Sequence, residues 1–490
     1  QMMSALGFDM PSGATVIEPR AMSLAFGIGL IVTVLSAWLP ARRAAKIAPI
    51  AAMRELSVDR SASSGLRAMI GAVMTCVGVA SVVSGNGNLV AIGALVTFAG
   101  VIVVAPVLTR PVASVLGLLL RTRGLRGELA TKNAVRNPKR TAGTAASLTI
   151  GVALVAFMTV FAASTKTSLA GSIDREFKGT HIVQTGGTDT SSGLSPLLAA
   201  ALRSTPGVDE VSESRLMPAV IDGVTTNPLY GFEGATVDDM IAFDRLTGDL
   251  GSLGPDGIAV SEKYAADRGW TIGTVVPATL PSGDTAFVVK AIYAGGTDWV
   301  GQVFVDLEAM RANGGENLDY QLYVSGDRTA IEQVAAAYPS AVVLDKHEFL
   351  AVVSSDIDTM LAMFYALLML AVVIALLGIA NTLSLSIFER TRELGVLRAM
   401  GMGRAQVRST VRWESIIIAL FGAVLGLSLG TFFGWAVVRT LADEGIDTLD
   451  IPIASLAAIA GIGAVSGALA AVMPARRAAK LDVLQALAAA

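Results

Sequence analysis

The residues of this chain whose types and spacing best suit a chemical role lie between two long apolar runs, in the segment 389–414. Acidic and basic side chains alternate there on a predicted short helix that also carries an apolar stripe. Gly401 and Gly403 permit a tight helix stop, and a second helix leads through Trp413 and Glu414 into the next run. Such a segment suits binding to a partner protein. Its candidate residues are Glu389, Arg390, Arg392, Glu393, Gly395, Leu397, Arg398, Ala399, Gly401 and Glu414, and its stripe comprises Leu394, Val396, Leu397 and Met400.

A simpler explanation is a charged loop that only anchors two membrane helices. For Glu414 alone this explanation is strong, because a carboxylate near a helix N-terminus is stabilised by the helix dipole. The complete ordered string of charges, apolar residues and glycines is much more specific than any single residue in it.

Patterns typical of catalysis do not stand out from ordinary surface charge. We find no Ser-His-Asp spacing, no HExxH and no paired carboxylates; His181 and His347 are far apart, and the single cysteine, Cys76, lies in an apolar run. The nucleotide-binding pattern GxxxxGK is absent, since no Gly is followed by Lys. We therefore expect no catalytic residue, no metal site and no cofactor bound by this chain.

The composition predicts a membrane protein, because 53% of the 490 residues are hydrophobic and only 16% are charged. A membrane helix needs about 20 apolar residues. The run 68–109 is about twice that length and is broken at SGNGN (84–88), so we predict a helical hairpin there and seven spans in all. The other runs lie between Arg20 and Arg42, Arg140 and Lys166, Asp358 and Glu389, Glu414 and Arg439, and Asp450 and Arg476.

The distribution of basic residues predicts the topology. Lys and Arg collect in the segments 40–67, 110–140 and 389–414 and near the C-terminus, as they do in cytoplasmic loops. Seven spans then place the N-terminus of this chain outside and the C-terminus in the cytoplasm. We expect a multi-pass protein of the bacterial cytoplasmic membrane.

The stretch 166–355 differs from the rest, with 25 Asp and Glu but only 12 Lys and Arg. Its alternating segments and short helical patterns, for example 208–221 and 329–340, predict an α+β domain. Since long domains cross the membrane regardless of charge, we expect it to be extracytoplasmic. Binding or coupling is a better interpretation of this domain than catalysis.

An internal duplication is visible in the heptapeptide PARRAAK, which occurs at 40–46 and 474–480 after spans that each contain GIG. The second copy closes a complete unit of one span, an outer domain and three spans, whereas the first copy has only its last span. We therefore expect the complete protein to begin roughly 300 residues earlier, from the length of the repeat.

Small residues recur every four positions on two predicted spans, which gives each helix a smooth face for close packing. Packing within one four-helix unit is the favoured explanation, and the seam between the two duplicated units is the alternative. The helix-packing residues are Gly422, Gly426, Gly430, Gly434, Gly463 and Gly467.

The stretch ANTLSLSIFERTRELGVLRAMGMGRAQVRSTVRWESIIIALFGAVLGLSLG (380–430) resembles the signature of the FtsX-like permease family of ABC systems, which includes macrolide-exporter, lipoprotein-release and cell-division permeases. ELATKNAVRNPKRTAGT (128–144) is similar to the element that opens each unit of that family. PARRAAK resembles the element that closes it, and GIAVSEKYAADRGWTIGTVV (257–276) resembles part of the MacB-like periplasmic core domain.

The resemblance implies a polytopic α-helical membrane permease with seven spans and an α+β extracytoplasmic domain of the MacB-like type. The implied domains are 1–48, the end of a truncated first unit; 49–66, a cytoplasmic linker; 67–109, a linker hairpin; 110–140, a basic cytoplasmic segment; 141–165, the first span of the second unit; 166–355, the extracytoplasmic domain; 356–480, a three-span permease domain; and 481–490, a cytoplasmic tail.

The family also implies a function. The segment 389–414 would contain the coupling helix that docks on a separate ABC ATPase, with two ATPase copies per complete permease and with ATP and Mg bound in that partner. The permease would then drive export or extraction of a hydrophobic or envelope substrate, namely a lipid, lipoprotein, peptide or drug, by mechanotransmission. This chain would not be the enzyme, and membrane lipid would be a further partner.

The main alternative is an ATPase-driven signalling subunit whose outer domain activates an extracytoplasmic enzyme, such as a cell-wall hydrolase, without transporting anything. A lipoprotein is another candidate partner, and nucleic acid is not expected. An ion-coupled secondary transporter is disfavoured, because that class carries ionisable residues at mid-membrane and the uncharged runs hold none.

Overall fold

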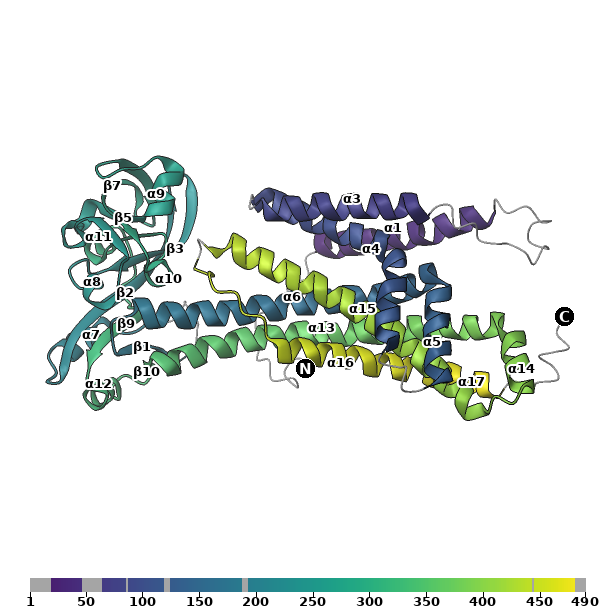
Figure 1. Cartoon of the computed structure of the whole chain (residues 1–490). Coiled ribbons are helices and arrows are strands. Elements are labelled where there is room, and N and C mark those ends of the chain that lie inside the picture. The colour runs from purple at the N-terminus through teal and green to yellow at the C-terminus, as the bar shows by residue number, and fades with distance from the viewer. Residues whose placement is uncertain are drawn as a thin grey trace. The chain divides into compact units, whose positions relative to one another are not determined.

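The computed structural model describes residues 19–45, 64–84, 87–118, 124–186, 193–442 and 445–480 (Figure 1). The chain divides into two compact units, 1–65 and 66–490, and each is described by itself. The linker predicted at 49–66 lies mostly outside the described residues, as do two positions of the SGNGN break, 85 and 86. The tail predicted at 481–490 lies wholly outside them.

Six of the described helices are long and apolar enough to cross a membrane. The seventh predicted span corresponds to α1 (Pro19–Ala44) of the first unit, whose apolar stretch, Met22–Trp38, is shorter. The six are α3 (Ser64–Val83), α4 (Gly87–Leu118), α6 (Pro138–Glu176), α13 (Lys346–Glu389), α15 (Arg404–Thr440) and α16 (Ile453–Ala470), which continues into α17 (Val472–Ala479).

Several of these helices extend past the boundaries predicted from the charges. Helix α4 continues through Arg110 to Leu118, although Pro106 and Pro111 lie inside it. Its last turns are held by packing on α5 (Leu125–Arg136), where Ala113 is buried against Ala130 and Ala134. Similarly, α6 begins before 141 and runs past 165, and α13 begins before 356. Charged residues mark where the apolar run stops, but they do not stop a helix.

Helix α6 is the central element of the bundle and packs against α15, α13 and α4. The small faces of α15 and α16 explain how closely these helices approach. A Cβ atom on Gly430 would lie 2.5 Å from the carbonyl oxygen of Ala153 in α6, and one on Gly467 would lie 2.6 Å from the Cβ of Ala419 in α15. Gly422, Gly426 and Gly434 likewise face α6, and Gly463 faces α15. The described stripes therefore pack within one unit.

Between α6 and α13 the chain folds into an α+β sheet domain, as predicted. Its ten strands follow the order β10-β1-β9-β2-β3-β8-β5-β7-β4, and β6 pairs with β2 and β7. The pairs β3–β8 and β5–β7 are parallel, and the other printed pairs are antiparallel. The strands are β1 (His181–Thr185), β2 (Val208–Ile221), β3 (Val224–Phe232), β4 (Arg245–Gly248), β5 (Gly257–Ser261), β6 (Val275–Leu280), β7 (Gly283–Ala294), β8 (Val303–Asp306), β9 (Gln321–Gly326) and β10 (Ala341–Asp345).

Short helices cover this sheet, and one of them, α12 (Arg328–Ala335), overlaps the predicted helical stretch 329–340. In 257–276, the strand β5 leads into α9, which ends at Gly269 in the left-handed conformation with φ 69°. The helices are α7 (Pro196–Arg203), α8 (Val237–Met240), α9 (Glu262–Arg268), α10 (Thr297–Val300), α11 (Leu307–Ala312) and α12 (Arg328–Ala335). The domain has separate cores around β6 and β7 and around α7 and β9.

An aromatic cluster joins the sheet domain to the two helices that lead into it. Phe177, just after α6, stacks on Trp299 with ring centroids 5.0 Å apart, and Phe349, in the first turn of α13, stacks on the same indole at 5.9 Å. Asp345 and Glu348 form a capping box that starts α13 directly after β10. Both helices are therefore anchored in one core of the sheet domain.

Candidate functional site

The segment 389–414 forms a helical junction between α13 and α15. Helix α13 ends at Glu389, and the short helix α14 (Thr391–Ala399) follows. The chain then reverses at Gly401, whose φ of 103° is accessible to glycine and strained for other residues. Gly403 precedes α15, and its N–H donates to the Gln406 Oε1 at 2.8 Å. The predicted second helix is thus the start of one long helix, α15.

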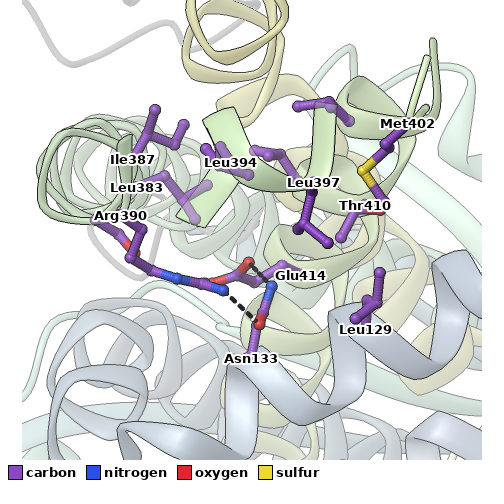
Figure 2. Close-up of a pocket in the computed structure, with 13 residues that line it drawn as sticks. Leu129, Asn133, Leu383, Ile387, Arg390, Leu394, Leu397, Met402, Thr410 and Glu414 are labelled. Atoms are coloured by element: carbon purple, nitrogen blue, oxygen red, sulfur yellow. Dashed lines mark hydrogen bonds between the residues drawn. The ribbon is translucent and has the colours of Figure 1, made fainter. Parts of the chain in front are cut away.

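A chain of partly buried hydrogen bonds, which ends on a buried carboxylate, links this junction to α5 (Figure 2). Nη2 of Arg390 donates to Oδ1 of Asn133 at 2.8 Å, and Nδ2 of Asn133 donates to Oε2 of Glu414 at 3.2 Å. The Glu414 residue is only 6% exposed. A buried carboxylate is costly unless it is hydrogen-bonded and near a positive charge, and Asn133 and Arg390 supply both. We call these three residues the buried relay.

Two further arginines, at the end of α5 and the start of α6, connect the same elements. Nη1 of Arg136 donates to Oε1 of Glu393 at 3.0 Å, and Nη1 of Arg140 donates to Oε2 of Glu389 at 3.0 Å. Nη2 of Arg140 also donates to the Ser386 hydroxyl at 2.8 Å. These ion pairs are partly exposed, and such pairs contribute roughly 0–1 kcal/mol each. They set the position of α14 more than they stabilise the fold.

Glu393 belongs to both sets of contacts. Its other carboxylate oxygen, Oε2, accepts a hydrogen bond from Nε of Arg390 at 2.9 Å. Partial burial acts to raise the pKa of Glu393, but the hydrogen bonds and positive charges of Arg390 and Arg136 outweigh it, so the pKa lies below its usual value. Glu393 is therefore ionised at neutral pH and holds α14 against α5 and α6.

The relay lies beside a small cavity of about 40 Å³. Its walls are mostly apolar, and the stripe residues Leu394 and Leu397 point into it (Figure 2). This volume holds a water molecule or two and is too small for a transported substrate. Its other lining residues include Leu129, Leu383, Ile387, Met402, Val407, Thr410 and Val411.

The rest of the predicted stripe faces away from the bundle. Met400 is 72% exposed and Val396 is 40% exposed, and Phe388, at the end of α13, is 79% exposed. Apolar side chains that cluster on a polar, helical surface are typical of an interaction site. The stripe is thus divided between an inner half that fills the junction and an outer half that is available to a partner.

The structure brings half of the predicted site residues together. Glu389, Arg390, Glu393 and Glu414 take part in the network, and Leu397 lines the cavity. Gly395 is buried in α14, whereas Arg392, Ala399 and Gly401 are exposed and Arg398 is half-buried. The explanation of Glu414 by a helix dipole is wrong, because α15 begins at Arg404 and Glu414 lies well inside it.

Sequence reasoning missed three members of this site, namely Asn133, Arg136 and Arg140. All three lie in 128–144, the element that resembles the opening of a permease unit, and that resemblance was the available signal. Among the described residues, no cluster of three or more His, Cys, Asp or Glu could hold a metal ion.

A second buried charge network lies within the sheet domain. Arg215 is 2% exposed; its Nε donates to Oδ1 of Asp319 at 2.7 Å, and its Nη2 donates to Oε2 of Glu213 at 3.1 Å. Oδ2 of Asp319 has no hydrogen-bond partner in the part of the chain that the structure describes. Burial, together with the negative charge of Glu213, raises the pKa of Asp319 to about 6 despite the arginine. This network joins β2 to the segment before β9.

Comparisons with known proteins show which proteins this chain resembles. Residues 365–483 match the family model described as FtsX-like permease C-terminal. A macrolide export ATP-binding/permease protein, MacB, of Photorhabdus laumondii is 36% identical over 119 residues, which cover 24% of this chain and 18% of that protein.

Two longer matches extend beyond that domain. The MacB of Bdellovibrio bacteriovorus is 25% identical over 302 residues, 60% of this chain and 43% of that protein. An uncharacterised ABC transporter permease protein of Mycobacterium tuberculosis is 26% identical over 442 residues, 84% of this chain and 51% of that protein. The chain thus spans about half, or less, of the length of these relatives.

Proposed function

Because the chain belongs to the FtsX-like and MacB-like family of ABC transporter permeases, we propose that it couples ATP hydrolysis by a separate ATPase subunit to export or extraction of a hydrophobic or envelope substrate. The family implies an ATPase partner. In this proposal the ATPase docks on α14, and the movement reaches the extracytoplasmic sheet domain mechanically. The substrate would be a lipid, lipoprotein, peptide or drug.

One observation supports mechanical transmission above all others, namely the continuity of α6 and α13. They contain 39 and 44 residues, which correspond to about 58 and about 66 Å at the rise of an α-helix. A membrane span needs only about 20 residues. Each helix has one end in the charged network at the junction and the other in the aromatic cluster of the sheet domain. A displacement at one end therefore has a stiff path to the other.

The buried relay and the ion pairs suit the input end of this path. Glu393 of α14 is held by Arg136 of α5, and Glu389 at the end of α13 is held by Arg140 of α6. A push on α14 would thus be shared between α6 and α13 rather than absorbed by a flexible loop. The small cavity behind α14 supports the same interpretation, since little empty space is available to absorb the displacement.

The exposed half of the apolar stripe is the proposed docking surface. A helix that inserts apolar anchors into a groove of a partner is a common mode of recognition. Met400 is the most exposed large apolar residue of α14 and its turn, and an aspartate there would place a charge in the interface. Since loss of a buried anchor typically costs about 2 kcal/mol, we expect roughly 30-fold weaker binding of the ATPase.

The test compares Met400→Asp with Met473→Asp in permease reconstituted with its ATPase. Met473, in α17, is 70% exposed and provides a matched control of the same residue type. We expect Met400→Asp to weaken binding of the ATPase roughly 30-fold and so to reduce its co-purification and the permease-stimulated ATP turnover at limiting ATPase concentration, with an unchanged circular dichroism spectrum, while Met473→Asp retains both. Equal turnover in the two variants would remove α14 as the docking element.

A further inference from the structure

A cavity of about 90 Å³ lies where α4, α6 and α15 meet. One wall comes from Val101, Ile102, Ala105 and Pro106 of α4. The opposite wall comes from α6, where small residues leave room, and Leu425 of α15 closes the side. This cavity is separate from the junction at α14, and none of its lining residues belongs to the buried relay.

Two cations line this otherwise largely apolar cavity. Arg67 reaches it from α3, and Lys139 is the second residue of α6. Nε of Arg67 donates to the carbonyl oxygen of Val103 in α4 at 3.1 Å. This bond fixes the guanidinium at the wall and uses one of its five N–H groups. None of the described residues that line the cavity is acidic.

The start of α6 adds little to this positive potential. Pro138, its first residue, has no N–H group, and the N–H groups of Arg140 and Thr141 donate to the carbonyl oxygen of Asn137 at 3.1 Å. The cavity therefore combines apolar walls with a positive end that is formed by Arg67 and Lys139. A ligand complementary to it has an acyl chain and an anionic head group.

The space beside α6 is open at Gly143. A Cβ atom built on this residue meets no described atom within 4 Å, in contrast to Gly430 and Gly467, where it would collide with a neighbouring helix. The close packing of the bundle is therefore interrupted here, between α6 and α4. In a membrane such a space is filled by a lipid chain or by protein.

We propose that this site binds one anionic phospholipid, with its phosphate at the rim of the cavity between Arg67 and Lys139 and only a few methylene groups of one acyl chain in the space of about 90 Å³ between α4 and α6. Basic pockets between membrane helices on the cytoplasmic side are suited to such head groups. The lipid would join the α3–α4 hairpin to the rest of the bundle. This binding does not depend on the proposed ATPase coupling.

The experiment measures lipid retention by native mass spectrometry of the whole chain, after exchange from nanodiscs of phosphatidylglycerol or phosphatidylcholine. The wild-type protein should retain one phosphatidylglycerol in preference to phosphatidylcholine. Arg67→Gln with Lys139→Gln should weaken retention by about 30-fold, because each cation near an anionic head group contributes to binding. The control is Arg110→Gln, which removes an exposed charge from the neighbouring helix α4 outside the cavity.

A second variant fills the acyl site without changing any charge. Gly143→Leu places a side chain in the open space and should displace the lipid. The thermal stability of this variant in phosphatidylcholine should equal that of the wild type. Equal retention by the double variant and the wild type would overturn the proposal. So would an equal loss in Arg110→Gln, or indifference to head-group charge. If Gly143→Leu lowers stability, the charge variants and their control still decide the question.

Discussion

The close packing of α15 on α6 can be tested with a single glycine-to-alanine substitution, which adds only one methyl group. In Gly430→Ala the new methyl group would lie 2.5 Å from the Ala153 oxygen, 2.6 Å from the Ala156 Cβ and 2.8 Å from the Phe157 nitrogen. Carbon atoms in favourable contact are about 3.5–4.0 Å apart. Two of the three obstacles are backbone atoms, so no rotamer change relieves them, and the helices must separate.

The expected magnitude follows from two opposing effects. Overpacking in a well-packed core costs about 1–3 kcal/mol, and a rigid backbone neighbour favours the upper value. Replacing Gly by Ala inside a helix recovers up to about 1 kcal/mol. Gly430→Ala should therefore lower the free energy of unfolding by about 2 kcal/mol.

Gly461 on α16 provides the matched control, since a Cβ there meets nothing within 4 Å in the described structure. Gly461→Ala should be neutral or slightly stabilising, which separates the two variants by about 2–3 kcal/mol. Unfolding in mixed micelles, followed by circular dichroism at increasing denaturant, measures the difference. Equal stability of the two variants would show that α6 and α15 do not pack as described.

Two further predictions concern the buried charges. Glu414→Ala should lower the free energy of unfolding by about 1–3 kcal/mol, because it leaves the Asn133 side-chain N–H group without its acceptor. Asn133→Ala should cost less stability in the Glu414→Ala background than in the wild type. Additive losses in thermal unfolding would contradict the hydrogen bond between the two side chains. For Asp319, the raised pKa means that the folded state binds the proton more tightly than the unfolded state. The wild type should thus lose up to about 3 kcal/mol relative to Asp319→Asn as the pH rises from about 4 to about 6, with the loss complete above that range. A pH-independent difference in stability would show that Asp319 titrates normally.

The apolar runs, the α+β domain and the packing residues could be predicted because each is a local property of the sequence. The length of an apolar run identifies a membrane helix, and the alternation of apolar and polar residues identifies a strand such as 208–221. The small faces were recognisable from their spacing, although their partner was not. That Gly430 meets Ala153 depends on how two distant segments pack.

The environment of Glu414 was beyond local reasoning for a similar reason. Its hydrogen-bond partner, Asn133, is 281 residues away, and the residue types around Asn133 do not by themselves distinguish it from any other asparagine of a polar segment. The continuity of α6 past Lys166 was missed because charges end the apolar run without ending the helix. The sheet domain supplies the packing that extends the helix, through Ile173 in its aromatic core.

The position of Trp299 has a practical consequence. This indole is 5% exposed and lies against one ring that follows α6 and another that belongs to α13. Any twist or slide of one helix relative to the other must change the surroundings of the indole. When Trp38, Trp270, Trp413 and Trp435 are replaced by phenylalanine, Trp299 is the remaining tryptophan. Its fluorescence emission would then report movement of α6 relative to α13 where the two helices enter the sheet domain, without an attached dye.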